Sequence, residues 1–136
     1  MPQMTIGKLA REAGIGIDAI RFYEREKLIP PPARTAAGYR LYREADGRRL
    51  RFIRRAKELG FSLAEVRDLL YLADGAGHKQ EVKALARNKL TQIEAQIADL
   101  QRMHAVLQAL EERCSGRGGV HNCPIIESLS HEASTP

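Results

Sequence analysis

The stretch that decides the fold class runs from Glu81 to Arg113 and reads EVKALARNKLTQIEAQIADLQRMHAVLQALEER. Apolar or small residues recur along it at alternating steps of three and four, and His104 takes the one polar place in the series. These residues, called the seam below, are Ala86, Leu90, Ile93, Ile97, Leu100 and Leu107. Heptad spacing predicts a helix that packs along another helix. Such a helix is about 50 Å long, longer than the interior of a small globule, so we expect a second copy of the chain to cover the seam.

Composition and charge are typical of a small helical protein with a nucleic-acid-binding head. The 136 residues are 43% hydrophobic but only 5% aromatic, without Trp, which favours an aliphatic core. Residues 1–60 hold 14 Lys and Arg against 7 Asp and Glu, whereas residues 61–136 hold 8 against 10. A basic half and a mildly acidic half predict a DNA-binding head and a separate assembly module. A solvated basic surface without a partner is the alternative.

No apolar stretch suggests a membrane span or a signal peptide. A span needs about 18 or more consecutive apolar residues, and charged residues interrupt the N-terminus early. We therefore expect a cytoplasmic protein without a membrane partner, whose two cysteines stay reduced. In that setting they serve metal binding, redox sensing or packing rather than a structural disulfide.

Two short helices begin the basic half. The first follows Thr5, a typical N-cap residue, and ends at Gly14. The second covers about residues 17–27, and the side chains expected to face inward there are Ile17, Ile20 and Leu28. Two short helices joined by a glycine-containing turn predict a helix-turn-helix, whose second helix enters the DNA major groove.

A small wing is predicted next. Prolines at 30–32 end the second helix because proline lacks the amide donor. Residues 34–42, RTAAGYRLY, place a turn of small residues before an alternating strand pattern, which predicts a two-stranded hairpin. We expect Arg34 and Arg40 to contact phosphates and Tyr39 both to pack and to donate a hydrogen bond. Tyr42 is expected only to pack.

A third helix, over residues 43–60, has one apolar and one cationic face. The side chains expected to be buried are Leu50, Phe52, Ile53, Ala56 and Leu59. The opposite face carries Arg48, Arg49, Arg51, Arg54, Arg55 and Lys57. Phosphate is the expected partner of these cations, and pairing with nearby acidic residues is the alternative. Gly47 is unexplained here, since glycine weakens a helix by about 1 kcal/mol. A fourth helix, 63–73, and a flexible break at 74–77 follow.

Cys114 and Cys123 are separated by eight residues, three of them glycine, so the loop can bring both sulfurs to one point. This is not a zinc-finger spacing, and two soft ligands suit Cu(I), Ag(I), Au(I) or Hg(II). Pro124 begins a short helix over 125–129, whose amides are expected to stabilise the Cys123 thiolate. Three alternatives stay open: inert packing, a reversible disulfide, and a Zn(II) or Hg(II) site completed by His121.

Four blocks of the sequence stand in the order and spacing of a known family: TIG with LA at 5–10, IRFYE at 20–24, GYRLY at 38–42 and LGFSL at 59–63. Over residues 4 to about 129 the chain resembles the mercury-resistance-regulator (MerR) family of metal-responsive transcriptional regulators. The cysteine loop is most similar to the copper-efflux-regulator (CueR-like) branch. The resemblance implies a mainly all-α fold: a winged helix-turn-helix head with a β-hairpin wing, an added helix pair, and a long helix forming an antiparallel coiled-coil homodimer.

The resemblance also implies roles for individual residues. The DNA-contacting set, to which we add Arg34, Arg48 and Arg54, is Arg21, Tyr23, Tyr39 and Arg40. Divalent-ion branches carry a further Cys where this chain has Lys79, beside His78. That departure disfavours Zn(II), Cd(II) and Pb(II) and removes the three-thiolate arrangement familiar for Hg(II). The copper branch carries a Ser at this position, so Lys79 departs from that pattern too. His78 and His121 are expected to lie near the site. Lys79 of the other subunit either balances the charge of two thiolates around a monovalent ion or is a solvated residue.

The sequence therefore predicts a regulator rather than an enzyme. Its expected parts are a DNA-binding domain (1–74), a hinge and dimerisation helix (75–113), a metal loop with a short helix (114–129) and a disordered tail (130–136). The homodimer is expected to bind promoter DNA and, on binding Cu(I) at Cys114 and Cys123, to distort it so that RNA polymerase transcribes efflux or detoxification genes. The rivals are an Hg(II) or Zn(II) sensor, a thiol-redox switch and a sensor of organic ligands.

Overall fold

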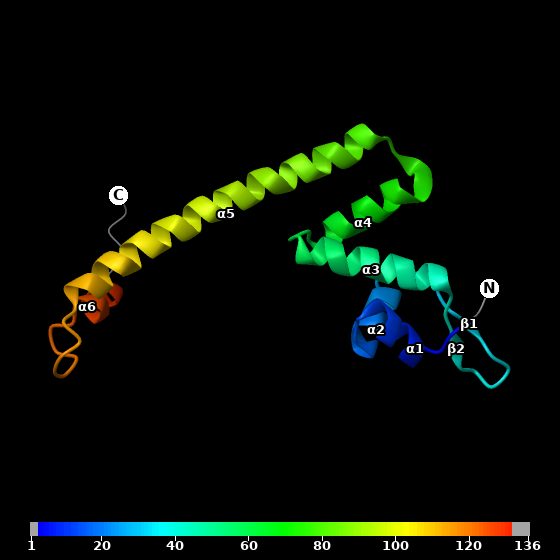
Figure 1. Ribbon diagram of the computed structural model, residues 1–136, viewed down its shortest axis with the longest axis horizontal. Helices are drawn as coiled ribbons and strands as arrows, with labels where there is room; N and C mark the ends of the chain where they lie inside the picture. Colours follow the sequence, from blue (N-terminus) through cyan, green and yellow to red (C-terminus); the bar gives the residue numbers. More distant parts are fainter. Residues whose placement is uncertain (1–2, 132–136) are drawn as a thin grey trace. The chain divides into compact units, whose positions relative to one another are not determined.

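The computed structural model describes residues 3–131. Its described residues divide into two compact units, one up to residue 89 and one from residue 90 on. Six α-helices, one π-helical turn and two short strands make up the described part (Figure 1). This mainly helical content with one small sheet confirms the predicted fold class. None of the helices in residues 3–131 combines the length and apolar character needed to cross a membrane.

The helix-turn-helix consists of α1 (Ile6–Ala13) and α2 (Ile17–Arg25). Thr5 caps α1 as predicted, its hydroxyl accepting a hydrogen bond from the Lys8 N–H at 3.3 Å. The chain leaves α1 through Gly14 with φ 68°, a left-handed conformation that favours glycine. This sharp exit turns the chain so that α2 packs across α1.

The wing is an antiparallel pair of two-residue strands, β1 (Ala33–Arg34) and β2 (Arg40–Leu41). Its turn is closed by the Thr35 hydroxyl, which accepts from the Tyr39 N–H at 3.1 Å, and by Arg34, which donates to the Gly38 carbonyl at 2.8 Å. Backbone bonds of 2.8 Å between Met4 and Tyr42 hold the wing beside the start of α1. The predicted hairpin is therefore confirmed.

The core of residues 1–89 lies between the helix-turn-helix, α3 (Glu44–Glu58) and α4 (Leu63–Tyr71). Its fully buried side chains are Leu9, Ile20, Leu28, Ile29, Tyr42, Leu50, Ile53 and Val66. Three residues predicted to be buried are not: Ile17 and Phe52 are each 38% exposed and Leu59 is 49% exposed. Ile17 begins α2 and Leu59 follows the last residue of α3, where the chain turns away from the core. Phe52 precedes the fully buried Ile53, and neighbouring residues of a helix point about 100° apart. Phe52 therefore points partly away from the core.

Packing does not explain Gly47. It lies buried in α3 opposite α1, and a Cβ atom built there would lie 3.5 Å from Leu9 Cδ1, an ordinary van der Waals contact. The approach of α1 to α3 therefore leaves room for a methyl group at this position.

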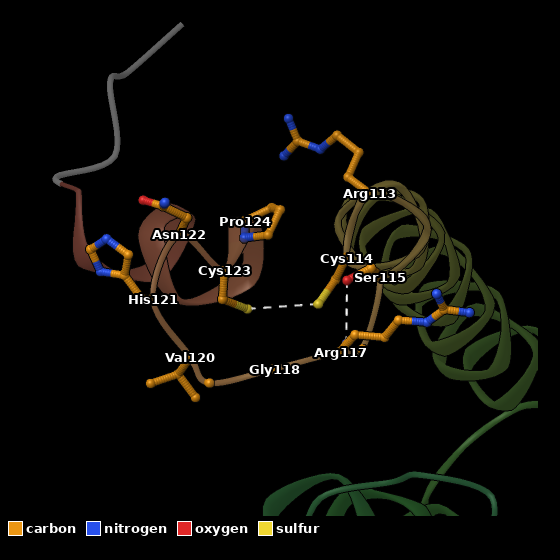
Figure 2. A pocket seen from close by; sticks show the side chains of 12 residues that line it. Arg113, Cys114, Ser115, Arg117, Gly118, Val120, His121, Asn122, Cys123 and Pro124 are labelled. Atoms are coloured by element: carbon orange, nitrogen blue, oxygen red, sulfur yellow. Dashed lines mark hydrogen bonds between the residues drawn. The ribbon is translucent and has the colours of Figure 1, made fainter.

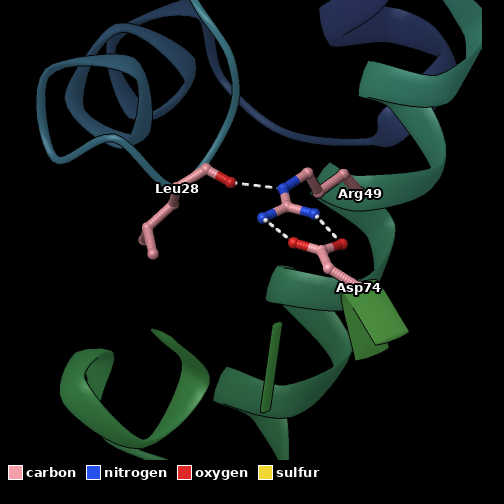
Figure 3. A network of polar contacts seen from close by, with 3 residues as sticks. All are labelled: Leu28, Arg49 and Asp74. Carbon is pink, nitrogen blue, oxygen red and sulfur yellow. Dashed lines mark hydrogen bonds and ion pairs between the residues drawn. The ribbon is translucent and has the colours of Figure 1, made fainter. Parts of the chain in front are cut away.

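The segment predicted to be a flexible break, 74–77, overlaps a turn that is held by hydrogen bonds. Leu72–Ala76 forms a π-helical turn, with Gly75 at φ 100°. Arg49 of α3 holds this turn through two hydrogen bonds to Asp74, at 2.9 and 3.2 Å, and its Nε donates to the Leu28 carbonyl at 2.5 Å (Figure 3). One guanidinium thus joins the segment after α2 to the entrance of the long helix.

The long helix α5 spans Lys79–Arg113 and contains the predicted seam. Several seam side chains are exposed in the chain, among them Leu90, Ile97, Leu100 and Leu107, whereas Leu110 near the end of α5 is buried. The chain then turns back, and α6 (Pro124–Ser130) lies beside the end of α5 (Figure 1). Of the tail predicted to be disordered, 130–136, Ser130 belongs to α6, and residues from 132 on lie outside the described residues.

Candidate functional site

The two cysteines meet at the end of α5. Cys114 directly follows the last residue of α5, and Cys123 is the N-cap residue of α6. Both are free and half-buried, and their Sγ atoms lie 3.9 Å apart (Figure 2). The sequence expectation that the loop brings both sulfurs to one point agrees with this geometry.

The loop between the cysteines curls because three of its residues adopt left-handed backbone conformations. Gly116 has φ 73°, Gly118 φ 83° and Asn122 φ 63°, and Gly and Asn are the residues that adopt this region most readily. The Ser115 hydroxyl accepts from the Arg117 N–H at 3.2 Å and tightens the first turn. The loop surrounds an open cavity of about 330 Å³ lined by residues 113–124.

The pKa of the Cys123 thiol is lowered by its surroundings. Hydrogen bonds from the backbone N–H groups of Ile126 and Ile125 lower its pKa, and the Cys114 thiol contributes in the same direction. Burial and the nearby Glu127 carboxylate oppose this effect without reversing it. At neutral pH a larger fraction of Cys123 is therefore thiolate than of an ordinary cysteine. The thiolate is the form that binds soft metal ions.

The sulfur pair fits a soft ion. At a metal–sulfur bond length of about 2.3 Å, a linear ion separates its two sulfurs by about 4.6 Å. The 3.9 Å separation of the two sulfurs is about 0.7 Å shorter, so a small opening of the loop would let both thiolates hold a soft ion between them.

The expected neighbours of the site are His78, Lys79 and His121. Among residues 3–131, no group of three or more Cys, His, Asp or Glu side chains is placed to hold a metal ion. His121 lies in the loop but its ring points away from both sulfurs (Figure 2). His78 and Lys79 stand at the start of α5, where the His78 N–H donates to Glu81 at 3.1 Å. Roles for these residues stay predictions.

Four of the predicted DNA-contacting residues lie together between α2 and the wing. A cavity of about 230 Å³, called the wing cavity, is lined by Thr5, Ile6, Arg21, Arg34, Gly38, Tyr39 and Arg40. Arg21 is exposed on α2, and Tyr39 at the wing tip is 72% exposed. Cations from two elements around one hollow suit a phosphate group of a nucleic-acid backbone.

The other three predicted DNA-contacting residues are placed differently. Tyr23 is half-buried and packs against the core, its ring centroid 5.6 Å from that of Phe22. Arg54 donates to the Gly14 carbonyl at 3.2 Å and pairs with Glu58 at 3.6 Å, so it braces the turn of the helix-turn-helix. Arg48 is exposed on α3. Contacts of these three residues with DNA stay predictions.

Sequence reasoning missed Glu24, which lies within this cationic surface. Its Oε2 accepts a hydrogen bond from the Tyr42 hydroxyl at 2.9 Å, and its Oε1 lies 3.4 Å from Arg40 Nε. Tyr42, expected only to pack, is thus also a donor. The one available signal was an acidic residue three positions after Arg21 on the predicted DNA-reading helix.

Comparison with known protein families identifies the family of this chain. Residues 4–72 match the family described as MerR HTH family regulatory protein, and residues 48–110 match the one described as MerR, DNA binding. The chain belongs to the MerR family. Members of this family are DNA-binding transcriptional regulators, so the prediction that the chain is not an enzyme is confirmed.

Relatives that are named as regulators of different metal responses are similar to this chain over nearly its whole length. The mercuric resistance operon regulatory protein of Serratia marcescens is 42% identical over 97% of this chain and 91% of its own length. The HTH-type transcriptional regulator CueR of Yersinia pestis is 44% identical over 93% of this chain and 91% of its own length. Similar identity to both leaves the branch within the MerR family open.

Two solved structures of transcription regulators, each in complex with a metal ion, are similar in fold to this chain. The regulator PbrR691 from Ralstonia metallidurans CH34, in complex with lead(II), is 36% identical and matches 93% of this chain and 99% of its own with a TM-score of 0.81. MerR from Bacillus megaterium MB1, in complex with mercury(II), is also 36% identical and matches 94% and 100% with a TM-score of 0.72.

Proposed function

We propose that this MerR-family protein is a metal-responsive transcriptional activator that binds promoter DNA as a homodimer. Its effector is a soft metal ion held by Cys114 and Cys123, with Cu(I) as the proposed ion and Ag(I) and Au(I) as chemical equivalents. The observation that carries this proposal is the 3.9 Å approach of two free thiols, one of which has a lowered pKa. The genes controlled are those of metal efflux or detoxification.

The exposed seam supports the homodimer. Leu100 and Leu107 of α5 are 61% and 63% exposed, and neighbouring seam residues are exposed as well. Exposed leucine and isoleucine side chains along one face of a helix, here interrupted by His104 and the half-buried Ile93, are unfavourable in water and typical of a surface covered by a partner. An antiparallel partner helix of the same sequence presents a matching row, as expected for a coiled coil.

The position of the thiols supports a sensing role. Binding of one ion by both thiolates would link the end of α5 to the start of α6, because Cys114 follows α5 and Cys123 caps α6. The same helix α5 begins at Lys79, after the turn that Arg49 anchors. In the proposed mechanism the ion favours one of two dimer conformations, and that conformation bends and untwists the promoter for RNA polymerase.

Hg(II) is the second candidate ion. Hg(II) is also a soft ion that two thiolates would hold, and relatives of this chain include a mercuric resistance operon regulatory protein. Zn(II) needs four ligands in a closed site, so it requires residues beyond the two cysteines, such as His121 or groups of the partner subunit.

A competition titration tests the ion. The reduced protein is titrated anaerobically with Cu(I), Hg(II) and Zn(II), following thiolate-to-metal absorption. We expect one Cu(I) per pair of thiols, strongest binding for Cu(I), and loss of binding in Cys114→Ser and Cys123→Ser. His121→Ala is the matched control in the same loop: Cu(I) binding should be unchanged, whereas a divalent site that uses His121 would weaken.

A transcription assay tests the response. In a reporter strain the wild type should activate on addition of the ion, and Cys114→Ser should retain DNA binding but lose activation. Survival of activation in Cys114→Ser would contradict metal sensing by this site. Activation by an oxidant, with a disulfide between the two cysteines and without metal, would instead support the thiol-redox switch.

A further inference from the structure

Glu24 is an acidic residue placed where an acid should harm DNA binding. It lies on α2 with its side chain only 16% exposed, and it shares a second cavity, of about 280 Å³, with Arg21, Arg25 and Arg40. A carboxylate near a phosphate backbone is repelled by it. Its burial among arginines therefore calls for an explanation beyond surface charge.

The Glu24 carboxylate is fixed from behind by Tyr42. The Tyr42 side chain is fully buried, and its hydroxyl donates to Glu24 Oε2 at 2.9 Å. Burial, followed by the Glu24 carboxylate, raises the pKa of Tyr42 to about 12. The hydroxyl therefore stays protonated at all physiological pH values and remains a donor to Glu24.

The other oxygen of the carboxylate faces Arg40. Glu24 Oε1 lies 3.4 Å from Arg40 Nε, a buried atom that makes no hydrogen bond among the described residues. The ion pair thus restrains the guanidinium at its inner edge, while the Arg40 side chain as a whole is 35% exposed. The outer edge, with the two terminal nitrogens, is left to face a ligand.

Arg40 stands between two cationic hollows. It lines both the wing cavity and the 280 Å³ cavity, and so does Arg21. Arginine binds phosphate best when both terminal nitrogens are presented in a fixed plane. An arginine that is already held loses less freedom on binding than one that must be ordered by the DNA.

We propose that Glu24 is a positioning residue for DNA binding: held by Tyr42, it fixes the Arg40 guanidinium so that its outer edge meets a phosphate of the DNA backbone between α2 and the wing. The inference rests on the DNA-binding part of the proposed function and is independent of the metal. Under this inference Glu24 strengthens DNA binding, whereas a negative charge without this positioning role would weaken it.

The test compares two variants with the same change in net charge. Binding to a fluorescent duplex of about 30 base pairs and mixed sequence is measured by anisotropy between about 50 and 200 mM KCl. Glu24→Gln should weaken binding up to about fivefold, the loss expected for a partly exposed ion pair. The slope of log K against log salt should fall by about 0.9 for each phosphate that the variant no longer neutralises. The control Glu12→Gln, on the exposed face of α1, should bind as tightly as wild type or more tightly.

Two further variants keep the inference testable. In a double-mutant cycle, Arg40→Gln should weaken binding, and adding Glu24→Gln to it should have little further effect. Tyr42→Phe removes only the hydroxyl and should weaken binding about threefold by releasing the carboxylate; it decides the matter if thermal unfolding shows that Glu24→Gln does not fold.

Folded Glu24→Gln that binds as tightly as wild type, or additive effects in the cycle, would overturn the inference. Failure of the wild type itself to bind DNA would instead overturn the proposed function. Wild-type binding without any response to metal would leave the inference on Glu24 standing and refute only the sensing part.

Discussion

Removing the Lys89 ammonium should destabilise residues 1–89. Lys89 Nζ, on α5, lies 2.8 Å from Glu65 Oε1 on α4, and the two side chains are only 11% and 24% exposed. The ammonium also lies 5.6 Å from the centre of the Phe61 ring. Glu65 caps α4 as well, accepting from the Ser62 N–H at 2.7 Å. The ion pair therefore joins the start of α4 to the first part of α5.

The magnitude follows from the pKa of Glu65. Lys89, as the largest cause, together with the Ser62 hydrogen bonds lowers this pKa from 4.5 to about 2. Such a difference corresponds to about 3 kcal/mol of stabilisation of the carboxylate at neutral pH. Ser62 accounts for part of it, and partial solvent exposure reduces the rest. We expect Lys89→Met to lower the free energy of unfolding by about 2 kcal/mol.

Urea unfolding at fixed protein concentration measures this loss, with Lys83→Met, an exposed lysine of the same helix, as the control. The stabilisation should also depend on pH. Because the folded pKa of Glu65 is depressed, its contribution is present above about pH 4.5 and is lost as the pH falls towards 2. Lys89→Met should flatten this acid dependence. A loss within about 0.5 kcal/mol of the Lys83→Met control, with an unchanged acid transition, would refute the reasoning.

Three further predictions concern packing, the hinge and assembly. Gly47→Ala should stabilise the protein by about 0.5–1 kcal/mol in thermal unfolding, since the new Cβ meets Leu9 at an ordinary 3.5 Å and glycine is the weaker helix former; a loss of stability would show that α1 and α3 cannot tolerate the methyl group. Asp74→Asn, which removes the ion pair with the partly exposed Arg49 side chain, should lower the free energy of unfolding in urea by about 1 kcal/mol. An unchanged free energy of unfolding would mean that the turn is held without this ion pair. Leu107→Asp should convert the dimer to monomer in analytical ultracentrifugation, and an unchanged sedimentation coefficient would place the dimer interface elsewhere.

The helices and the wing could be predicted because their signals are local. Thr5 and Gly14 bound α1 through hydrogen bonds and backbone conformations within a few residues. The seam of α5 follows from helical periodicity alone. The thiol pair was predictable for a related reason: eight residues with three glycines form a loop short and flexible enough to return to its start.

Charged residues could not be assigned in the same way, because their partners are distant in sequence. Arg49 and Arg54 appeared equivalent on one cationic face, yet Arg49 holds Asp74, 25 residues away, and Arg54 holds the Gly14 carbonyl, 40 residues away. A pattern of charges shows which face of a helix is polar. It does not show which carbonyl or carboxylate the fold brings within hydrogen-bonding distance of it.

By itself, the sequence of this MerR-family protein determined the order of its helices, the two-stranded wing and the convergence of Cys114 and Cys123. Only the tertiary structure decided that Phe52 stays exposed, that the hinge is an anchored turn and that Glu24 holds Arg40. The reason is physical: backbone conformation depends on neighbours along the chain, whereas burial and ion pairing depend on the approach of segments that only the folded core brings together.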